Sequence, residues 1–157
     1  MGKKVLIFAS LLAFVSCSTS TPKEFNEALT AGIAKAENLV NSYDPVVLEA
    51  MEKNMPDSIT SLSKRVLAEL AKEQFNIKEL ASSEDEMRLK KAAEDYIGAL
   101  INFVKSQNLY ADYSDSLSQE EIRAIDKVCS DALVTVKMLR SKLTDYQNAF
   151  IKDKNIK

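Results

Sequence analysis

A run of apolar residues near the end of the chain repeats at alternating spacings of three and four residues. Its members are Ile122, Ile125, Cys129, Ala132, Val136, Leu139, Leu143, Tyr146 and Phe150. These spacings place all of them on one face of an α-helix, and a face of this length is typical of a helix packed lengthwise against neighbouring helices. Ser118 and Glu121 form a capping box before the run, with Leu117 and Ile122 in the positions of a hydrophobic staple. The pattern predicts a helix over residues 119–151 in a helical bundle.

The three prolines of the chain all stand where a helix would begin. Thr21–Glu24 supplies an N-cap Thr, a Pro at the first helical position and a Glu that completes a capping box. Asp44–Pro45 repeats the device, so we expect residues 45–54 to form a short extra helix or a kinked extension of the first helix. Met55–Asp57 begins a longer helix, and Ser83–Glu86 forms the capping box of the next one.

The expected helices carry apolar stripes at helical spacing, which is the pattern of a shared core. In the helix after Ser83 this face comprises Leu89, Ala92, Ala93, Tyr96, Ile97, Leu100, Phe103 and Val104. Residues 108–118 are mostly polar and predict a connecting loop, with Leu109, Tyr110 and Tyr113 as packing anchors.

Composition supports the same fold class, because only three Gly and three Pro are present and a β-sandwich would need many turns. We therefore predict an all-α fold, an antiparallel up-down bundle of about four long helices with one short extra or kinked helix. The predicted domain is single and spans residues 22–151, and a frayed basic tail follows over residues 152–157.

The first residues of the chain have the parts of a secretory signal. Lys3 and Lys4 are positively charged, and the apolar run from Val5 to Val15 is too short to span a bilayer, which needs about 20 apolar residues. Phe14–Cys17 resembles the lipobox of bacterial lipoproteins, although Phe14 stands where that family usually has Leu. The resemblance covers residues 1–17. An ordinary cleaved signal with an incidental cysteine and an uncleaved amphipathic helix are the alternatives.

The resemblance to lipoproteins implies that residues 1–16 are a signal peptide and that residues 17–21 are a lipidated tether. In that family the cysteine thiol, here that of Cys17, receives a diacylglycerol, and its amine is often acylated after cleavage. The implied location is the bacterial cell envelope, on the outer membrane, facing either the periplasm or the surface. With Cys17 acylated, Cys129 has no cysteine left for a disulfide, so packing must hold the fold.

No motif in the sequence points to catalysis, and we expect no catalytic, metal or cofactor site. Histidine is absent, which removes the commonest general base and metal ligand. Asp112, Asp115 and Glu120 lack the spacing and the glycine of an EF-hand, and Cys129 occupies a position typical of a buried structural thiol. A net charge of −2 without a basic block argues against nucleic acid as a partner.

A difference in helix length suggests an interaction surface. The first helix is expected over residues 22–43 and the longer last helix over residues 119–151. Leu143, Tyr146 and Phe150 would therefore present an apolar seam unless the kinked segment covers them. Packing of this seam within the monomer is the alternative. The expected function is non-catalytic protein–protein interaction or structural tethering, with an envelope or extracellular protein or a second copy as the partner.

A carrier of a small hydrophobic ligand is the alternative function. It predicts a cavity inside the bundle near Tyr96, Phe103, Val136 and Leu139. A close-packed core at these positions would contradict it.

Overall fold

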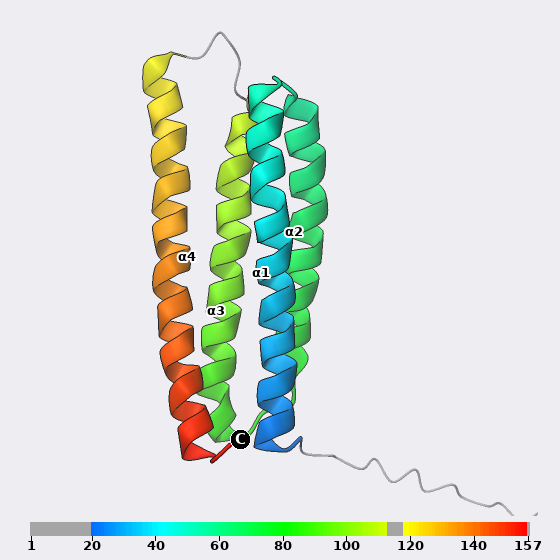
Figure 1. Cartoon of the computed structure of the whole chain (residues 1–157), viewed down its shortest axis with the longest axis vertical. Coiled ribbons are helices and arrows are strands. Elements are labelled where there is room, and N and C mark those ends of the chain that lie inside the picture. The colour runs from blue at the N-terminus through cyan, green and yellow to red at the C-terminus, as the bar shows by residue number, and fades with distance from the viewer. Residues whose placement is uncertain (1–19, 113–117, 157) are drawn as a thin grey trace, which may run out of the picture.

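The computed structural model describes residues 20–112 and 118–156, and over these residues the chain is an all-α bundle without strands. Its four long helices are α1 (Pro22–Glu52), α2 (Pro56–Glu79), α3 (Glu84–Gln107) and α4 (Gln119–Asp153), with a short 3-10 helix, η1 (Asn108–Asp112), after α3. Successive helices run up and down side by side (Figure 1). The predicted up-down helical bundle is confirmed. None of the helices in the described ranges is long and apolar enough to cross a membrane.

Side-chain caps begin three of the helices at the predicted residues. The Thr21 hydroxyl accepts from the Glu24 amide at 3.2 Å, and the Glu24 carboxylate accepts from the Thr21 amide at 2.8 Å. The same pair of contacts joins Ser118 and Glu121, at 3.3 and 2.8 Å, before α4. The Ser83 amide donates to the Glu86 carboxylate at the start of α3. Leu117, expected to staple α4, and Tyr113 lie outside the described residues.

Helix α1 continues through Pro45, so the separate short helix expected there is wrong, and residues 45–52 extend the first helix, which was the other expected arrangement. Pro45 has no amide hydrogen to donate to the carbonyl four residues earlier, which destabilises a helix. The buried stripe nevertheless continues at helical spacing through Tyr43, Val47 and Ala50, so helix beyond the proline brings further apolar side chains into the core. Burial therefore outweighs the lost hydrogen bond.

The proline inside α1 gives a stability prediction. Because an interior proline costs about 3 kcal/mol relative to alanine, we expect Pro45→Ala to raise the free energy of unfolding by about 1–3 kcal/mol in urea titrations. Pro22 and Pro56 stand at the starts of α1 and α2, where no helical hydrogen bond is lost, so Pro22→Ala and Pro56→Ala are the matched controls and should change stability little. Equal effects at all three positions would contradict a continuous α1.

The core lies mainly between α1, α2 and α3. Its fully buried members include Leu29, Ala36, Tyr43, Val47, Leu70, Ile77, Ala93, Ile97 and Val104. The Tyr43 hydroxyl reaches across it and hydrogen-bonds the Ser63 hydroxyl at 2.7 Å. Burial raises the pKa of Tyr43 above its usual value, so the phenol stays protonated and available for this bond.

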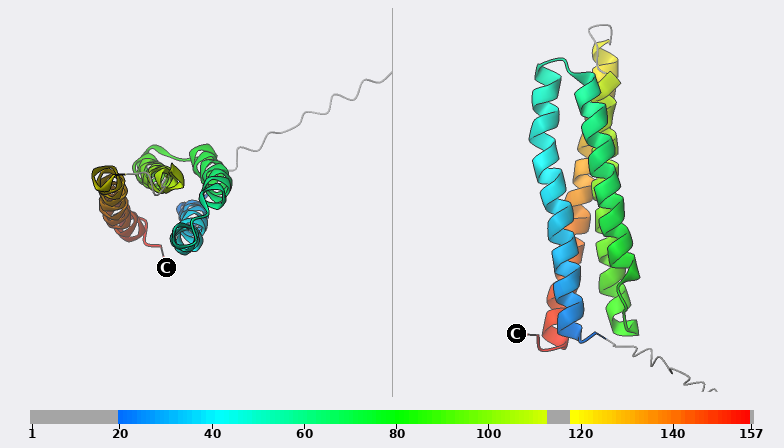
Figure 2. Two further views of the ribbon diagram at one scale, coloured as in Figure 1. Left: turned by 90° about the horizontal axis from the view of Figure 1, so that it is seen from above. Right: turned by 90° about the vertical axis from the view of Figure 1, so that its right-hand side faces the viewer.

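Helix α4 packs mainly against α3, and only its C-terminal half also contacts α1. There the Phe150 and Phe25 rings meet edge to face with centroids 5.9 Å apart, and the Gln147 amide donates to the Thr30 hydroxyl at 2.8 Å. Seen from above, α4 adjoins α3 and lies across from α1 (Figure 2). The two halves of α4 thus have different surroundings.

The predicted frayed tail is wrong for residues 152–156. Helix α4 extends to Asp153, and the Lys154 ammonium binds the Asp85 carboxylate at 2.8 Å. Asn155 adopts a left-handed conformation, φ 50, and the Ile156 amide donates to the Ile151 carbonyl. Ile156 also packs against the core, so a hydrophobic contact and a capping turn end the helix. Lys157 lies outside the described residues.

Candidate functional site

The apolar seam expected at the end of α4 is buried, which corrects the proposed interaction face. Leu143 is 0% exposed, Phe150 is buried, and Tyr146 is half-buried with the Arg88 guanidinium 4.3 Å above its ring. The up-down topology explains the result, because it places the end of α4 beside the beginning of α1 rather than beside its end. If α1 were too short to cover α4, the residues left exposed would lie in the N-terminal half of α4.

The structure instead has an open groove of about 840 Å³ between α1, α3 and the N-terminal half of α4, which we call the α1–α4 groove. It is lined by Glu37, Val40, Asn41, Asp44, Pro45, Leu48, Tyr96, Leu100, Phe103, Gln107, Tyr110, Asp126, Cys129, Ser130, Leu133 and Val136. Tyr96, Phe103 and Val136 are three of the four residues predicted to surround a cavity. The fourth, Leu139, packs against the core instead.

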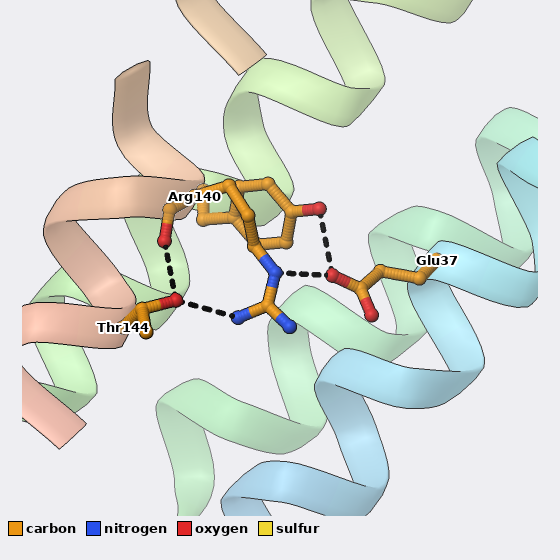
Figure 3. A network of polar contacts seen from close by, with 4 residues as sticks. Glu37, Arg140 and Thr144 are labelled. Atoms are coloured by element: carbon orange, nitrogen blue, oxygen red, sulfur yellow. Dashed lines mark hydrogen bonds and ion pairs between the residues drawn. The ribbon is translucent and has the colours of Figure 1, made fainter. Parts of the chain in front are cut away.

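A polar cluster of three residues joins three helices and closes the lower end of the groove, which is the end nearer the C-terminus of α4 (Figure 1). Glu37 of α1 accepts from the Arg140 Nε of α4 at 2.7 Å and from the Tyr96 hydroxyl of α3 at 2.9 Å. Arg140 also donates to the Thr144 hydroxyl at 3.3 Å, as Figure 3 shows. The Arg140 guanidinium lies 5.7 Å from the centroid of the Tyr96 ring. We call Glu37, Tyr96 and Arg140 the clasp.

The clasp depends on a protonated tyrosine. Burial, and then the hydrogen bond to the Glu37 carboxylate, raise the pKa of Tyr96 well above its ordinary value. The hydroxyl is therefore a donor at neutral pH, and the carboxylate accepts from both Tyr96 and Arg140. Below this cluster α1 and α4 are in contact, and above it the groove separates them.

The upper end of the groove carries two further carboxylates, each held by a neighbour. The Gln107 amide nitrogen donates to Asp44 Oδ1. The Tyr110 hydroxyl donates to Asp126 Oδ1 at 2.9 Å, and burial followed by this bond raises the pKa of Tyr110. Since Gln107 and Tyr110 are three residues apart, about one helical turn, they hold both carboxylates at the same end of the groove.

Gln107 has an unsatisfied acceptor at this end. Its side chain lines the groove, the residue is only 5% exposed, and its Oε1 has no hydrogen-bond partner among the described residues. The contact with Asp44 fixes the orientation of the amide, because only the nitrogen can donate to a carboxylate. A buried carbonyl oxygen without a partner is costly, so this acceptor would gain from a donor.

Apolar side chains form the middle of the groove. Leu100 and Phe103 of α3 are buried, while Leu133 of α4 is 37% exposed and Val136 is half-buried. The predicted buried thiol of Cys129 lies in this region and is confirmed as buried. The groove is thus polar at both ends and apolar between them, the usual character of a small-ligand site.

Sequence reasoning did not identify Asp44, Gln107 or Asp126 as site residues. Asp44 had a simpler interpretation as a helix cap before Pro45, and Gln107 and Asp126 belong to no motif. Their association depends on how α1, α3 and α4 pack. Among residues 20–112 and 118–156, no three Asp, Glu or Cys side chains group together as metal ligands would. Cys17, the predicted lipidation site, lies outside the described residues.

Comparisons of the chain with protein-family models, with curated proteins and with solved structures find no match.

Proposed function

We propose that this chain is a lipid-anchored envelope protein of bacteria that binds a small, largely apolar ligand in the α1–α4 groove without converting it chemically. The open groove of about 840 Å³ is the observation that carries the proposal. Small-ligand sites in proteins typically measure about 300–1,000 Å³ and combine apolar walls with a few polar groups. The groove has this size and this distribution of polar groups.

The lipid anchor at Cys17 is supported by the lipobox-like sequence Phe14–Cys17. Each methylene that enters the bilayer contributes roughly 0.8 kcal/mol, so two or three acyl chains hold a protein at a membrane durably. An anchored bundle would keep its groove near lipids and other apolar compounds of the envelope. This proximity raises the effective concentration of such ligands.

Protein–protein interaction, the first function expected from the sequence, stays a second candidate. Leu143 and Phe150 are buried and no longer supply its surface. Val134 and Met138, however, lie four residues apart on α4 and are 62% and 61% exposed. This exposed face of α4 would serve for docking an envelope protein or a second copy of the chain.

A pair of neighbouring substitutions on α4 tests ligand binding in the groove. Leu133 lines the groove and Val134 does not. We expect Leu133→Trp to fill the groove and to lower the affinity for the neutral apolar probe N-phenyl-1-naphthylamine by about tenfold or more. A tenfold loss of affinity corresponds to about 1.4 kcal/mol of binding free energy, which the loss of one buried contact can account for. Val134→Trp is the matched control and should bind like the parent. The probe's fluorescence increase measures binding to the full chain carrying Cys17→Ser, so that no acyl group attached at residue 17 competes for the groove.

Two outcomes would contradict a ligand site in the groove. One is the absence of saturable probe binding by the parent chain. The other is an equal affinity of the parent chain and of Leu133→Trp, since the substituted side chain lies in the groove wall. A loss of binding in Val134→Trp alone would move the site to the exposed face of α4.

A further inference from the structure

We infer that the α1–α4 groove selects an amphiphilic amine, a ligand with a positively charged, hydrogen-bond-donating head group and an apolar chain. The head group would lie between Asp44 and Asp126, and the chain would run down the groove towards the clasp. This inference rests on the proposed ligand-binding function and adds the chemical class of the ligand.

The charges of the groove favour a cation. The residues that line it include three carboxylates, those of Glu37, Asp44 and Asp126, and no lysine or arginine. Glu37 is paired with Arg140 in the clasp. Among the described residues, neither Asp44 nor Asp126 forms an ion pair. A ligand that covers these two carboxylates removes them from water, and a positive charge on the ligand offsets that desolvation.

The hydrogen-bonding groups at the upper end require donors from the ligand. Asp44 and Asp126 each use Oδ1 in the contact with Gln107 or Tyr110, which leaves the second carboxylate oxygen without a partner among the described residues. Both free carboxylate oxygens only accept, and an ammonium group supplies three donors. Gln107, whose buried Oε1 lacks a donor among the described residues, lines the same end of the groove. A carboxylate or phosphate head group would meet two negative charges that no lysine or arginine of the lining offsets.

The middle of the groove suits an alkyl chain of moderate length. Asp44 and Glu37 are seven residues apart on α1, so the upper carboxylates and the clasp are separated by about 10 Å at 1.5 Å per residue. The wall between them is formed by Leu100, Phe103 and Val136. An extended chain of eight carbons, with bonds of about 1.5 Å, is about 9 Å long. Octyl compounds therefore match the groove in length.

Three octyl compounds with different head groups test the inference by isothermal titration calorimetry on the full chain carrying Cys17→Ser. At pH 7 octylamine is a cation, octanol is neutral and octanoate is an anion, as the ordinary pKa values of amino and carboxyl groups require. We expect octylamine to bind at least tenfold more tightly than octanol, and octanoate to bind most weakly.

The double variant Asp44→Asn/Asp126→Asn removes both charges and keeps an oxygen that accepts from Gln107 and from Tyr110. We expect it to lower the affinity for octylamine to that for octanol, while the affinity for octanol stays unchanged. Asp145→Asn is the matched control, because Asp145 is an exposed acid of α4 that does not line the groove.

The possible failures are distinguishable. If octanol or octanoate binds as tightly as octylamine, or if the double variant keeps its preference for octylamine, the inferred head group is wrong and the groove still binds apolar ligands. If none of the three compounds binds and the neutral naphthylamine probe also fails, the proposed function is wrong, and the inference with it.

Discussion

Leu143→Ala should lower the free energy of unfolding by about 3–5 kcal/mol, whereas Leu133→Ala, the same substitution on the same helix, should lower it by less than about 1 kcal/mol. Leu143 is 0% exposed and belongs to the shared core, so its truncation leaves a cavity among α1, α3 and α4. Leu133 faces the groove and is 37% exposed, so water already reaches the space that truncation enlarges.

Urea titrations followed by far-ultraviolet circular dichroism measure both changes, with the slope of the transition as a check for two-state unfolding. A difference of this size is expected if α4 contacts both α3 and α1 at its C-terminal half, whereas its N-terminal half packs against α3 and borders the open groove on its other side. Losses of equal size at the two positions would mean that α4 packs evenly along its length, and the groove would not be open.

Cys17→Ser should abolish acylation of the chain in a bacterial host that processes lipoproteins. The cysteine thiol is the group that receives the diacylglycerol in the family that Phe14–Cys17 resembles, and serine does not replace it. We expect an alkyne-tagged palmitate to label the parent chain and to leave Cys17→Ser unlabelled. Mass spectrometry of the parent should give a chain that begins at Cys17 and carries two or three acyl groups.

Cys129→Ala is the control for this labelling, because Cys129 is the second of the two cysteines and is buried in the bundle. It should be labelled as strongly as the parent. Membrane fractionation alone would not suffice, since an unprocessed signal segment can also hold a chain at the membrane. Equal labelling of Cys17→Ser and the parent would contradict the proposed anchor.

The helix boundaries were predictable because local chemistry sets them. A capping box involves side chains only three residues apart, so Thr21, Ser83 and Ser118 marked the starts of α1, α3 and α4 correctly. The predicted start of a separate helix at Pro45 was wrong because the local signal, an Asp followed by Pro, competes there with burial of Val47 and Ala50, which favours the alternative, an extension of α1. The helical spacing of Tyr43, Val47 and Ala50 in the sequence indicates a helix that continues past Pro45.

The groove was predictable only in part because it depends on the separation of two helices. The apolar stripe of α4 continues without change from Ile122 to Phe150, but it is well buried only near its C-terminal end and at Cys129. Periodicity shows which face of a helix turns inward and does not show how far away the facing helix lies. A cavity was predicted inside the bundle near Tyr96, Phe103, Val136 and Leu139, and the first three of these residues line an open groove instead. The carboxylates at the upper end of the groove depend on packing between helices.

The most direct test of the ligand site is methyl-group nuclear magnetic resonance of the chain during titration with octylamine. Val40, Leu100, Leu133 and Val136 line the groove, while Leu29, Val47 and Leu70 lie in the core away from its walls. We expect the methyl signals of the first group to shift in a saturable manner and those of the second group to stay in place. Shifts confined to the outer face of α4 at Val134, or no saturable shifts among the groove methyls, would contradict the assignment of the groove as the binding site.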